Sequence, residues 1–229
     1  MRNIAIITAR GGSKRIPQKN IKEFCGRPII EYSIKAALDA GIYDEVMVST
    51  DNEEIADVAR AAGAKVPFLR SEKTSGDFAT TADVILEVIE TYEKLGEIFD
   101  YASCIYPTAP FVTAEKLREG MDILKKKRGD MIMPVVRFSF PPQRSMVFDG
   151  DFIKPRWPEN QNLRSQDLAP FYHDCGQFYC YDVKKFMRLR GQFVNGIIPI
   201  IMPETEVQDI DNMDDWEIAE LKYKLMCIR

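Results

Sequence analysis

The chain has 229 residues and a net charge of −4 at pH 7, with 45% hydrophobic and 29% charged residues. This balance is typical of a soluble globular protein, and the negative charge argues against a nucleic-acid partner. No apolar run is long enough to cross a membrane and no signal peptide is visible, so we expect a cytoplasmic protein without a membrane partner. Five cysteines without a CxxC spacing indicate reduced thiols.

Short apolar runs alternate with helix-like segments over the first 137 residues. The runs predict strands at Ile4–Thr8, Glu45–Thr50, Val66–Leu69, Ala102–Tyr106 and Met131–Val136. Apolar residues three and four positions apart predict helices at Pro28–Ala40, Glu53–Ala62, Thr80–Leu95 and Thr113–Lys127. The alternation predicts an α/β fold with a doubly wound, mostly parallel sheet.

The alternation breaks over Phe138–Asp174, which is rich in proline and aromatic residues. This stretch is too long for an ordinary connection, so we interpret it as a functional loop, a small subdomain or an oligomerisation arm inserted in the domain. Strands resume at Gly176–Asp182 and Gly196–Met202, and a last helix is predicted at Asn212–Met226. We expect residues 1–229 to form one domain that carries this insert.

A glycine-bearing loop, Ala9–Asn20, follows the first predicted strand directly. It carries four cations, Arg10, Lys14, Arg15 and Lys19. Gly11 and Gly12 would let backbone N–H groups approach an anion, and the cations would neutralise a leaving diphosphate. The loop is neither a Walker A motif nor a GxGxxG motif. It predicts a polyphosphate site and nucleotidyl transfer, with an exposed basic turn as the alternative.

Other polar residues follow the ends of other predicted strands. They are Ser49-Thr50-Asp51, Arg70 and Pro107–Pro110. Right-handed crossovers would bring these residues to the same edge of the sheet as the basic loop.

Asp209 and Asp211 alternate in an extended segment, with Ile210 pointing the other way. Two carboxylates on one side of a strand suit Mg²⁺, which favours oxygen ligands and commonly also contacts phosphate. A helix-capping turn before Asp214-Asp215 is the alternative. His173 is the chain's one histidine, which argues against a hydrolase of the Ser-His-Asp or Cys-His type.

These motifs together resemble those of the CMP-nonulosonate synthetases, also called acylneuraminate cytidylyltransferases, and within them the branch that acts on pseudaminic acid. The resemblance covers nearly the whole chain, and Ala9–Asn20 is its most specific part. The supporting matches are Val48–Asp51, Leu69-Arg70, Asp77–Thr81, Pro107–Pro110, Arg164 with Gln166–Leu168, and Asp209–Asp211.

The resemblance implies a Rossmann-like nucleotidyltransferase that transfers CMP from CTP to a nine-carbon 2-keto sugar acid and releases diphosphate. The catalytic residues would be Arg10, Lys14 and Lys19, and Asp209 and Asp211 would hold Mg²⁺. The residues that bind CTP would be Ala9, Arg10, Ser13, Lys14, Lys19, Asn20, Arg70, Ala79 and Thr81.

The resemblance also implies a sugar site and a homodimer. The residues that contact the sugar acid would be Tyr106, Arg144, Arg164, Gln166 and Tyr179. The segment Phe138–Asp174 would be a dimerisation arm that reaches the sugar site of a second copy. Tyr106 stands where the sialic acid enzymes usually carry Gln, which suits a less hydroxylated sugar such as pseudaminic acid.

Several alternatives remain open at this point. The sugar acid could be an N-acylneuraminate or a legionaminate. A glycosyltransferase of the GT-A type also uses an Asp-x-Asp metal site, although it would not need the basic loop. A nucleotide-binding module without catalysis is the third alternative.

Overall fold

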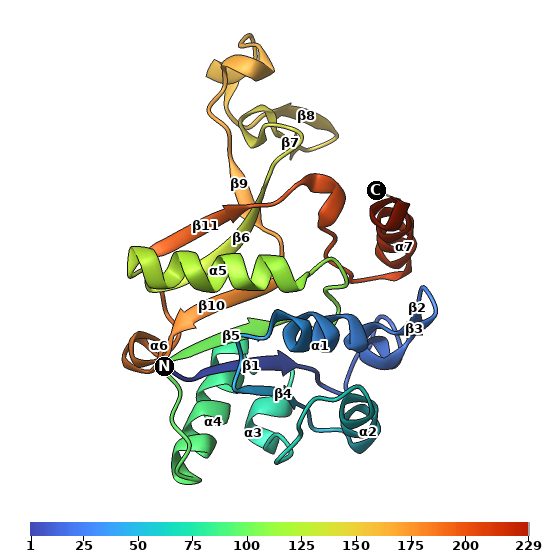
Figure 1. Ribbon diagram of the computed structural model, residues 1–229. Coiled ribbons are helices and arrows are strands. Elements are labelled where there is room, and N and C mark those ends of the chain that lie inside the picture. Colours follow the sequence, from blue (N-terminus) through green and yellow to red (C-terminus); the bar gives the residue numbers. More distant parts are fainter. Residues whose placement is uncertain (229) are drawn as a thin grey trace.

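The computed structural model describes residues 1–228 and is built around a seven-stranded mixed sheet (Figure 1). The strands follow the order β11-β6-β10-β5-β1-β4, and β9 pairs with β6. Their bounds are β1 (Asn3–Thr8), β4 (Glu45–Ser49), β5 (Tyr101–Ile105), β6 (Met131–Arg137), β9 (Tyr172–Asp174), β10 (Phe178–Asp182) and β11 (Ile197–Ile201).

Most strands of the sheet run in parallel. β1 pairs in parallel with β4 and β5, and β11 with β6. β10 is antiparallel to both β5 and β6, and β9 is antiparallel to β6. The carboxyl ends of β4, β1 and β5 therefore meet at one edge of the sheet, as the sequence predicts.

Helices cover both faces of the sheet. Residues of α1 (Ile29–Ala40), α2 (Glu53–Ala61) and α5 (Ala114–Lys127) share one apolar cluster, and residues of α4 (Thr81–Lys94) and α6 (Val183–Leu189) share another. The short α3 (Glu72–Ser75) precedes α4. This arrangement confirms the doubly wound α/β fold. Within residues 1–228, no helix combines the length and the apolar character needed to cross a bilayer.

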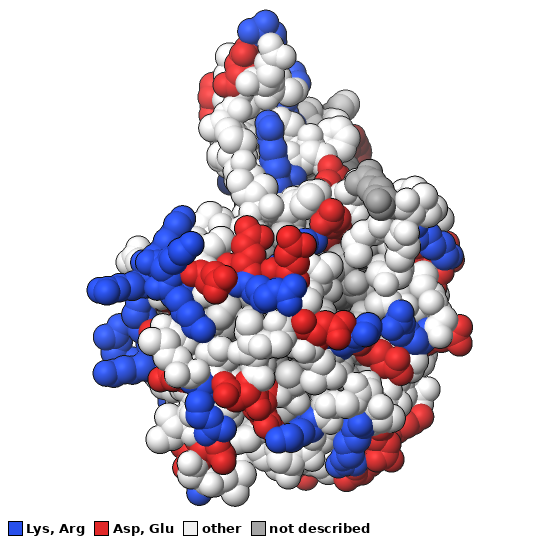
Figure 2. Space-filling view, in the orientation of Figure 1, with Lys and Arg blue, Asp and Glu red and all other residues white. Residues whose placement is uncertain are grey.

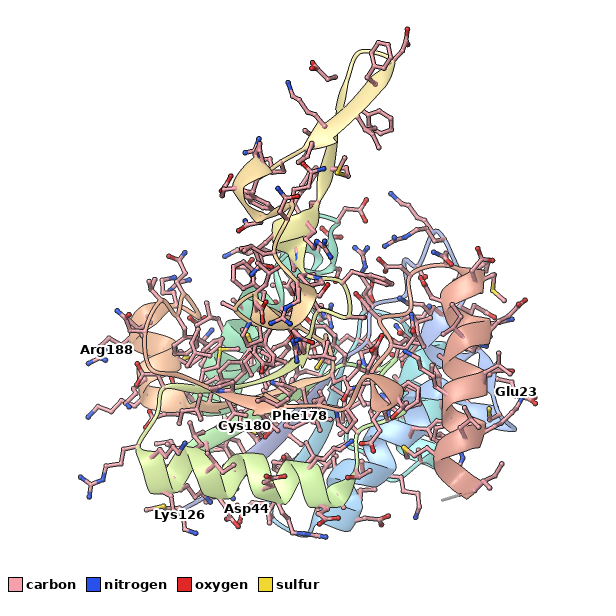
Figure 3. The ribbon with its side chains drawn as sticks, turned by 90° about the horizontal axis from the view of Figure 1, so that it is seen from above. Glu23, Asp44, Lys126, Phe178, Cys180 and Arg188 are labelled. Carbon is pink, nitrogen blue, oxygen red and sulfur yellow. The ribbon has the colours of Figure 1, made fainter. Side chains whose placement is uncertain are left out.

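The packing between α5 and the sheet depends on Gly120. A Cβ atom at this position would lie 3.2 Å from the Phe178 ring and 3.4 Å from the Cys180 sulfur. Figure 3 shows these two side chains of β10 beside α5. Cys180 is one of five free thiols, as the sequence predicts.

A third apolar cluster holds the last helix, α7 (Met213–Ile228), beside the hairpin of β2 (Glu23–Phe24) and β3 (Arg27–Pro28). Trp216 of α7 packs edge-on against Phe24, with 5.5 Å between ring centroids. Ile16 of the basic loop and Ile210 belong to the same cluster. Burial of these two isoleucines positions the basic loop and the Asp209–Asp211 segment against each other.

The strand predicted at Val66–Leu69 is wrong. Only Lys65 pairs with β4, where its N–H donates to Val46 and its carbonyl accepts from Val48, both at 2.9 Å. Pro67 follows two residues later and has no N–H to continue a ladder. The segment therefore leaves the sheet as irregular chain and delivers Arg70 to the edge near β4.

The segment 138–171 projects from the sheet as an arm, visible above the body in Figures 1 and 2. It contains a hairpin of β7 (Met146–Asp149) and β8 (Phe152–Pro155), and three 3-10 turns, η2 (Pro142–Arg144), η3 (Pro158–Asn160) and η4 (Ser165–Asp167). Figure 2 shows that much of the arm's visible surface carries neither acidic nor basic side chains. Exposed aromatic residues include Phe140, Phe148 and Phe152.

Two further 3-10 turns flank the sheet edge. They are η1 (Lys19–Ile21), at the end of the basic loop, and η5 (Glu204–Glu206), between β11 and the Asp209–Asp211 segment.

Candidate active site

A cavity of about 620 Å³ opens at the edge where β1, β4 and β5 end. All residues that the sequence assigns to nucleotide binding line it, except Ala9. These are Arg10, Ser13, Lys14, Lys19, Asn20, Arg70, Ala79 and Thr81. The basic loop thus faces a cavity large enough for a nucleotide, as a polyphosphate site requires.

Ala9 acts through its backbone. Its side chain is fully buried, and its N–H donates to the Ser49 carbonyl at 2.9 Å, which extends the pairing of β1 with β4 by one residue. This hydrogen bond fixes the point at which the chain leaves the sheet, and hence the position of Arg10.

Position 11 requires glycine because the backbone packs closely there, and not because the Gly11 N–H is available to bind an anion. Its N–H donates to the Asp51 carboxylate at 2.8 Å, so this amide is already used. A Cβ atom at Gly11 would lie 2.9 Å from Cβ of Asn52, which is closer than real side chains approach. Gly12 has open space around it and can still present its backbone to an anion.

Lys19 and Asn20 lie at the buried end of the loop. Asn20 donates from its side-chain amide to the Arg10 carbonyl at 2.8 Å, which closes the loop. The Lys19 ammonium donates to the Ile210 carbonyl at 2.6 Å. Burial lowers the pKa of Lys19, although the nearby charges of Asp211 and Asp209 raise it. Lys19 is therefore a partly desolvated cation, which interacts with phosphate more strongly than an exposed one does.

Arg10 and Lys14 share one anion, the carboxylate of Asp77. Arg10 contacts one carboxylate oxygen at 3.0 Å, and Lys14 contacts the other at 2.6 Å. Hydrogen bonding to Lys14 and its charge, together with Arg10, hold the pKa of Asp77 below its usual value. The two cations predicted to bind a triphosphate are thus already paired with an acidic side chain.

Arg70 and the start of α4 also line the cavity. The Arg70 guanidinium donates to the Ser49 hydroxyl at 3.1 Å and to the Ser49 carbonyl at 2.6 Å. Burial lowers the pKa of Arg70 below its usual value, but a guanidinium stays protonated. Thr80 caps α4 through a capping box with Asp83, so Thr81 is fixed at the first turn of the helix.

Asp209 and Asp211 lie on opposite sides of the Lys19 contact. Asp211 lines the nucleotide cavity and pairs with Arg15 at 2.9 Å, whereas Asp209 lines an adjoining cavity of about 320 Å³. Ile210 is only 1% exposed, so the two carboxylates flank a buried residue. They line different cavities, and their joint binding of a metal stays a prediction. Burial and the charge of Asp211 raise the pKa of Asp209.

A divalent cation would find only part of its ligand set in this protein. Residues 1–228 contain no cluster of three or more His, Cys, Asp or Glu side chains suited to a metal. Asp209 and Asp211 supply carboxylate oxygens, and the positive charges of Lys19 and Arg15 lie beside them. This donor set fits Mg²⁺, which usually keeps waters and phosphate oxygens as its other ligands.

Of the two tyrosines assigned to the sugar, Tyr106 lines the nucleotide cavity, whereas Tyr179 is buried and does not line it. Tyr106 places its hydroxyl 3.4 Å from the Thr81 hydroxyl. Its ring packs edge-on against Tyr179, with centroids 5.6 Å apart. Tyr179 in turn donates to the Asp174 carboxylate at 2.6 Å. Burial raises the pKa of both tyrosines, so both hydroxyls are protonated donors.

The remaining predicted sugar residues lie on the arm and do not line the nucleotide cavity. Arg144 donates to the Ser165 hydroxyl at 3.0 Å and to the Gln161 carbonyl at 3.3 Å. Arg164 forms a two-pronged pair with Asp167, at 2.7 and 3.1 Å. Gln166 lines a separate cavity of about 540 Å³ between the arm and the end of β6. One copy of the chain therefore does not bring these three residues to the nucleotide.

The structure gives partners to three charged residues at the site: the sequence names Asp77 and Arg15 within its motifs without assigning them a ligand or partner, and it assigns no role to Asp174. Asp77 pairs with Arg10 and Lys14, Arg15 pairs with Asp211, and Asp174 holds Tyr179. Asp77 is the one that a local signal could have revealed, because it lies two residues before Ala79 in a segment already assigned to the nucleotide site.

The chain is similar in sequence to known cytidylyltransferases. A family model described as cytidylyltransferase matches residues 4–169. The chain is 38% identical, over 98% of its length and 97% of the relative, to the pseudaminic acid cytidylyltransferase of Campylobacter jejuni subsp. jejuni serotype O:2. It is 32% identical, over 98% and 97%, to the CMP-N,N'-diacetyllegionaminic acid synthase of Legionella pneumophila subsp. pneumophila.

A solved structure shares the fold. It is a CMP:2-keto-3-deoxy-manno-octonic acid synthetase in complex with CTP, with a TM-score of 0.71, 16% sequence identity, and 99% and 100% of the two chains covered. At this identity the likeness extends to the fold alone.

Proposed function

The chain belongs to the cytidylyltransferase family, and from this membership we propose that it activates pseudaminic acid, in the reaction CTP + pseudaminic acid → CMP-pseudaminic acid + diphosphate. The observation that carries the proposal is the cavity in which Arg10, Lys14 and Lys19 face Arg70 and Thr81. The relatives named above support the choice of a sugar acid as acceptor.

The cavity offers two kinds of contact to CTP. Three of the four cations of the basic loop, Arg10, Lys14 and Lys19, would hold the triphosphate. Ser13 and the Gly12 backbone would add hydrogen bonds. Asn20, Arg70, Ala79 and Thr81 would hold the cytidine. Ala9 supports this arrangement from within the sheet, through its hydrogen bond to Ser49.

The chemical step is a displacement at phosphorus. The anomeric hydroxyl oxygen of the sugar acid bonds to the α-phosphorus of CTP, and the bond from that phosphorus to the bridging oxygen breaks. The hydroxyl proton passes to solvent, and the electron pair leaves with diphosphate. Lys14 and Lys19 would neutralise the charge that develops on the leaving diphosphate. Lys19, which is partly buried and held by the Ile210 carbonyl, would do this with little reorganisation.

We propose that Asp209 and Asp211 hold Mg²⁺. The ion would supply Lewis-acid polarisation of the phosphate oxygens and lower the pKa of a bound hydroxyl. Lys19 keeps the two carboxylates in place through its hydrogen bond to Ile210. Arg15 offsets the charge of Asp211 until a ligand arrives.

The sugar pocket is proposed to begin at Tyr106. The aromatic ring of Tyr106 would favour a sugar that carries a methyl group where sialic acid carries a hydroxylated chain. An N-acylneuraminate or a legionaminate is the alternative acceptor, and the relative that makes CMP-N,N'-diacetyllegionaminic acid keeps it open.

We further propose a homodimer built through the arm. Phe140, Phe148 and Phe152 are 87%, 86% and 79% exposed, more apolar surface than a lone protomer ordinarily leaves in water. In such a dimer, Arg144, Arg164 and Gln166 would complete the sugar site of the other copy. The reaction would take place in the cytoplasm, where CTP is available.

The decisive test is a diphosphate-release assay in which each nucleoside triphosphate is crossed with each sugar acid. We expect release with CTP and pseudaminic acid together, and not with either alone. Turnover with N-acetylneuraminate or legionaminate instead would correct the acceptor. Cleavage of a preformed nucleotide sugar would indicate a glycosyltransferase, and CTP binding without turnover for any acid would indicate a binding module.

A further inference from the structure

We propose that Asp77 is a positioning residue that stands in for the triphosphate: it holds Arg10 and Lys14 in the cavity while the site is free, and CTP must displace it to bind. The inference rests on the proposed function, because it takes these two cations as triphosphate ligands. The inference gives Asp77, an acidic residue, a role in a cavity that is proposed to bind an anionic ligand.

The geometry of the contact supports a stand-in rather than a chance surface pair. Each oxygen of one carboxylate faces a different cation, Arg10 at 3.0 Å and Lys14 at 2.6 Å. Both cations and Asp77 line the same cavity. A carboxylate held between a guanidinium and an ammonium occupies the position that a phosphate oxygen pair would take.

The segment that carries Asp77 is a short loop between two anchored ends, α3 before it and the capping box of Thr80 with Asp83 after it. Before it, Ser71 and Thr74 are hydrogen-bonded to the Glu87 carboxylate of α4, which anchors α3. Directly after Asp77, Phe78 is 100% exposed and packs against nothing in residues 1–228. The two ion pairs of Asp77 are therefore the side-chain contacts that hold the tip of this loop to the basic loop.

The contact is weak enough to be exchanged. The side chains of Arg10, Lys14 and Asp77 are 41%, 79% and 50% exposed, and ion pairs this exposed contribute little to stability. A triphosphate brings several negative charges, whereas Asp77 brings one. Displacement is therefore favourable for CTP, and the returning carboxylate competes with diphosphate once the reaction is complete, which speeds its release.

The proposed competition between Asp77 and phosphate predicts how Asp77→Asn should change the affinities for CTP, diphosphate and cytidine. Removing the competing charge should tighten binding of CTP and of diphosphate by about two- to fivefold, within the range expected for an exposed ion pair. Binding of cytidine, which has no phosphate, should not change. High salt should shrink the difference, because it screens exposed charges.

Calorimetric titration of the full chain with CTP, diphosphate and cytidine tests this pattern. The matched control is Asp57→Asn, because Asp57 is an exposed aspartate paired with Arg60 at 2.9 Å on α2, outside the cavity. Unchanged or weaker CTP binding by Asp77→Asn would overturn the proposal, because it would make Asp77 a supporting residue of the bound state. An equal gain in affinity for cytidine would also overturn the proposal, because Asp77 would then affect binding of the nucleoside and not of the phosphates.

A second measurement follows the loop directly. In Phe78→Trp, the new indole beside Asp77 should change its fluorescence on addition of CTP or diphosphate, and not on addition of cytidine. A signal that saturating CTP leaves unchanged would refute displacement. If the unaltered chain binds no CTP at all, the proposed function fails and this inference fails with it. Normal CTP binding with an unaltered Asp77→Asn affinity refutes the role of Asp77 alone.

Discussion

The ammonium group of Lys19 donates a hydrogen bond of 2.6 Å to the backbone carbonyl of Ile210, which lies 191 residues further along the chain. Ile210 is buried, and its two neighbours are Asp209 and Asp211. The basic loop and the paired carboxylates are therefore held as one unit. A change at Lys19 should disturb phosphate binding and the position of the carboxylates together.

Lys19→Ala is expected to lower kcat/KM by about 10²- to 10³-fold, as for deletion of one preorganised donor to a developing anion. Steady-state kinetics with CTP as the varied substrate measure the effect. Lys35→Ala is the matched control, because Lys35 is an exposed lysine paired with Asp39 on α1, away from the cavity. Kinetic constants for Lys19→Ala that equal those of the control would remove Lys19 from the mechanism.

Asp211→Asn is expected to raise the Mg²⁺ concentration needed for half-maximal rate by about 10- to 100-fold, because a neutral amide replaces one of two carboxylate ligands. Activity is measured across a Mg²⁺ titration at saturating CTP. Asp39→Asn, at an exposed helix position, should titrate like the unaltered chain. An Asp211→Asn curve that overlays this control would show that Asp211 does not bind the metal.

Tyr106→Gln is expected to shift the acceptor preference toward N-acetylneuraminate by about tenfold, a range typical of one altered apolar contact in a pocket. The measured quantity is the ratio of kcat/KM for pseudaminic acid to that for N-acetylneuraminate. The KM for CTP should remain near its original value. A ratio that does not move would show that the sugar does not contact this wall.

Glu87 should make the loop that precedes Asp77 sensitive to acid. Burial raises the pKa of Glu87, but hydrogen bonds from Thr74 and Ser71 outweigh it and hold the pKa below its usual value. A carboxylate with a lowered pKa contributes stability above its unfolded pKa and loses it as the pH falls through the folded value. Below about pH 4.5, the ordinary glutamate range, the contribution should therefore decline.

Thermal unfolding of the unaltered chain and of Glu87→Gln, between pH 3.5 and pH 7, measures this contribution. The Tm difference should be largest at pH 7 and should narrow as the pH falls. Glu53→Gln, on an exposed glutamate of α2, is the control and should show little difference at any pH. A Tm difference between Glu87→Gln and the unaltered chain that stays constant with pH would contradict the prediction.

The double variant Phe148→Lys with Phe152→Lys is expected to convert a dimer into a monomer, because it places charges on the exposed hairpin of the arm. Light scattering coupled to size-exclusion chromatography gives the mass in solution. Val194→Lys is the control, since Val194 is 87% exposed and lies outside the arm. Equal masses for the two variants would rule out the arm hairpin as the contact between copies.

Local periodicity was sufficient to predict most of the fold. The apolar runs at β1, β4 and β5 and the spacing of apolar residues in α1 are properties of short segments, and the structure confirms them. Sequence reasoning failed where one residue reversed the local trend: Pro67 ends pairing in a segment that is otherwise apolar. The helix α6 spans only Val183–Leu189, too short for its periodicity to be recognised.

The site residues that follow a single strand could be predicted from the sequence. The contacts between residues far apart in the sequence could not. Arg10, Lys14 and Lys19 come directly after β1, so their clustering follows from the sequence. The contact of Arg10 with Asp77 spans 67 residues, and that of Arg15 with Asp211 spans 196. Such contacts depend on how loops fold over the sheet edge, for which a single sequence carries no local signal.

The arm leaves and re-enters the sheet through one pair of neighbouring strands. Arg137 of β6 is paired directly with Tyr172 of β9, and the Phe138 N–H donates to the Phe171 carbonyl at 3.0 Å. The chain between these residues is thus closed at its base like a very long hairpin loop. A turn of about two to five residues could bridge the same two positions without changing the register of the sheet. The register of β6 with β9, and with it the sheet, therefore does not depend on the length of the arm.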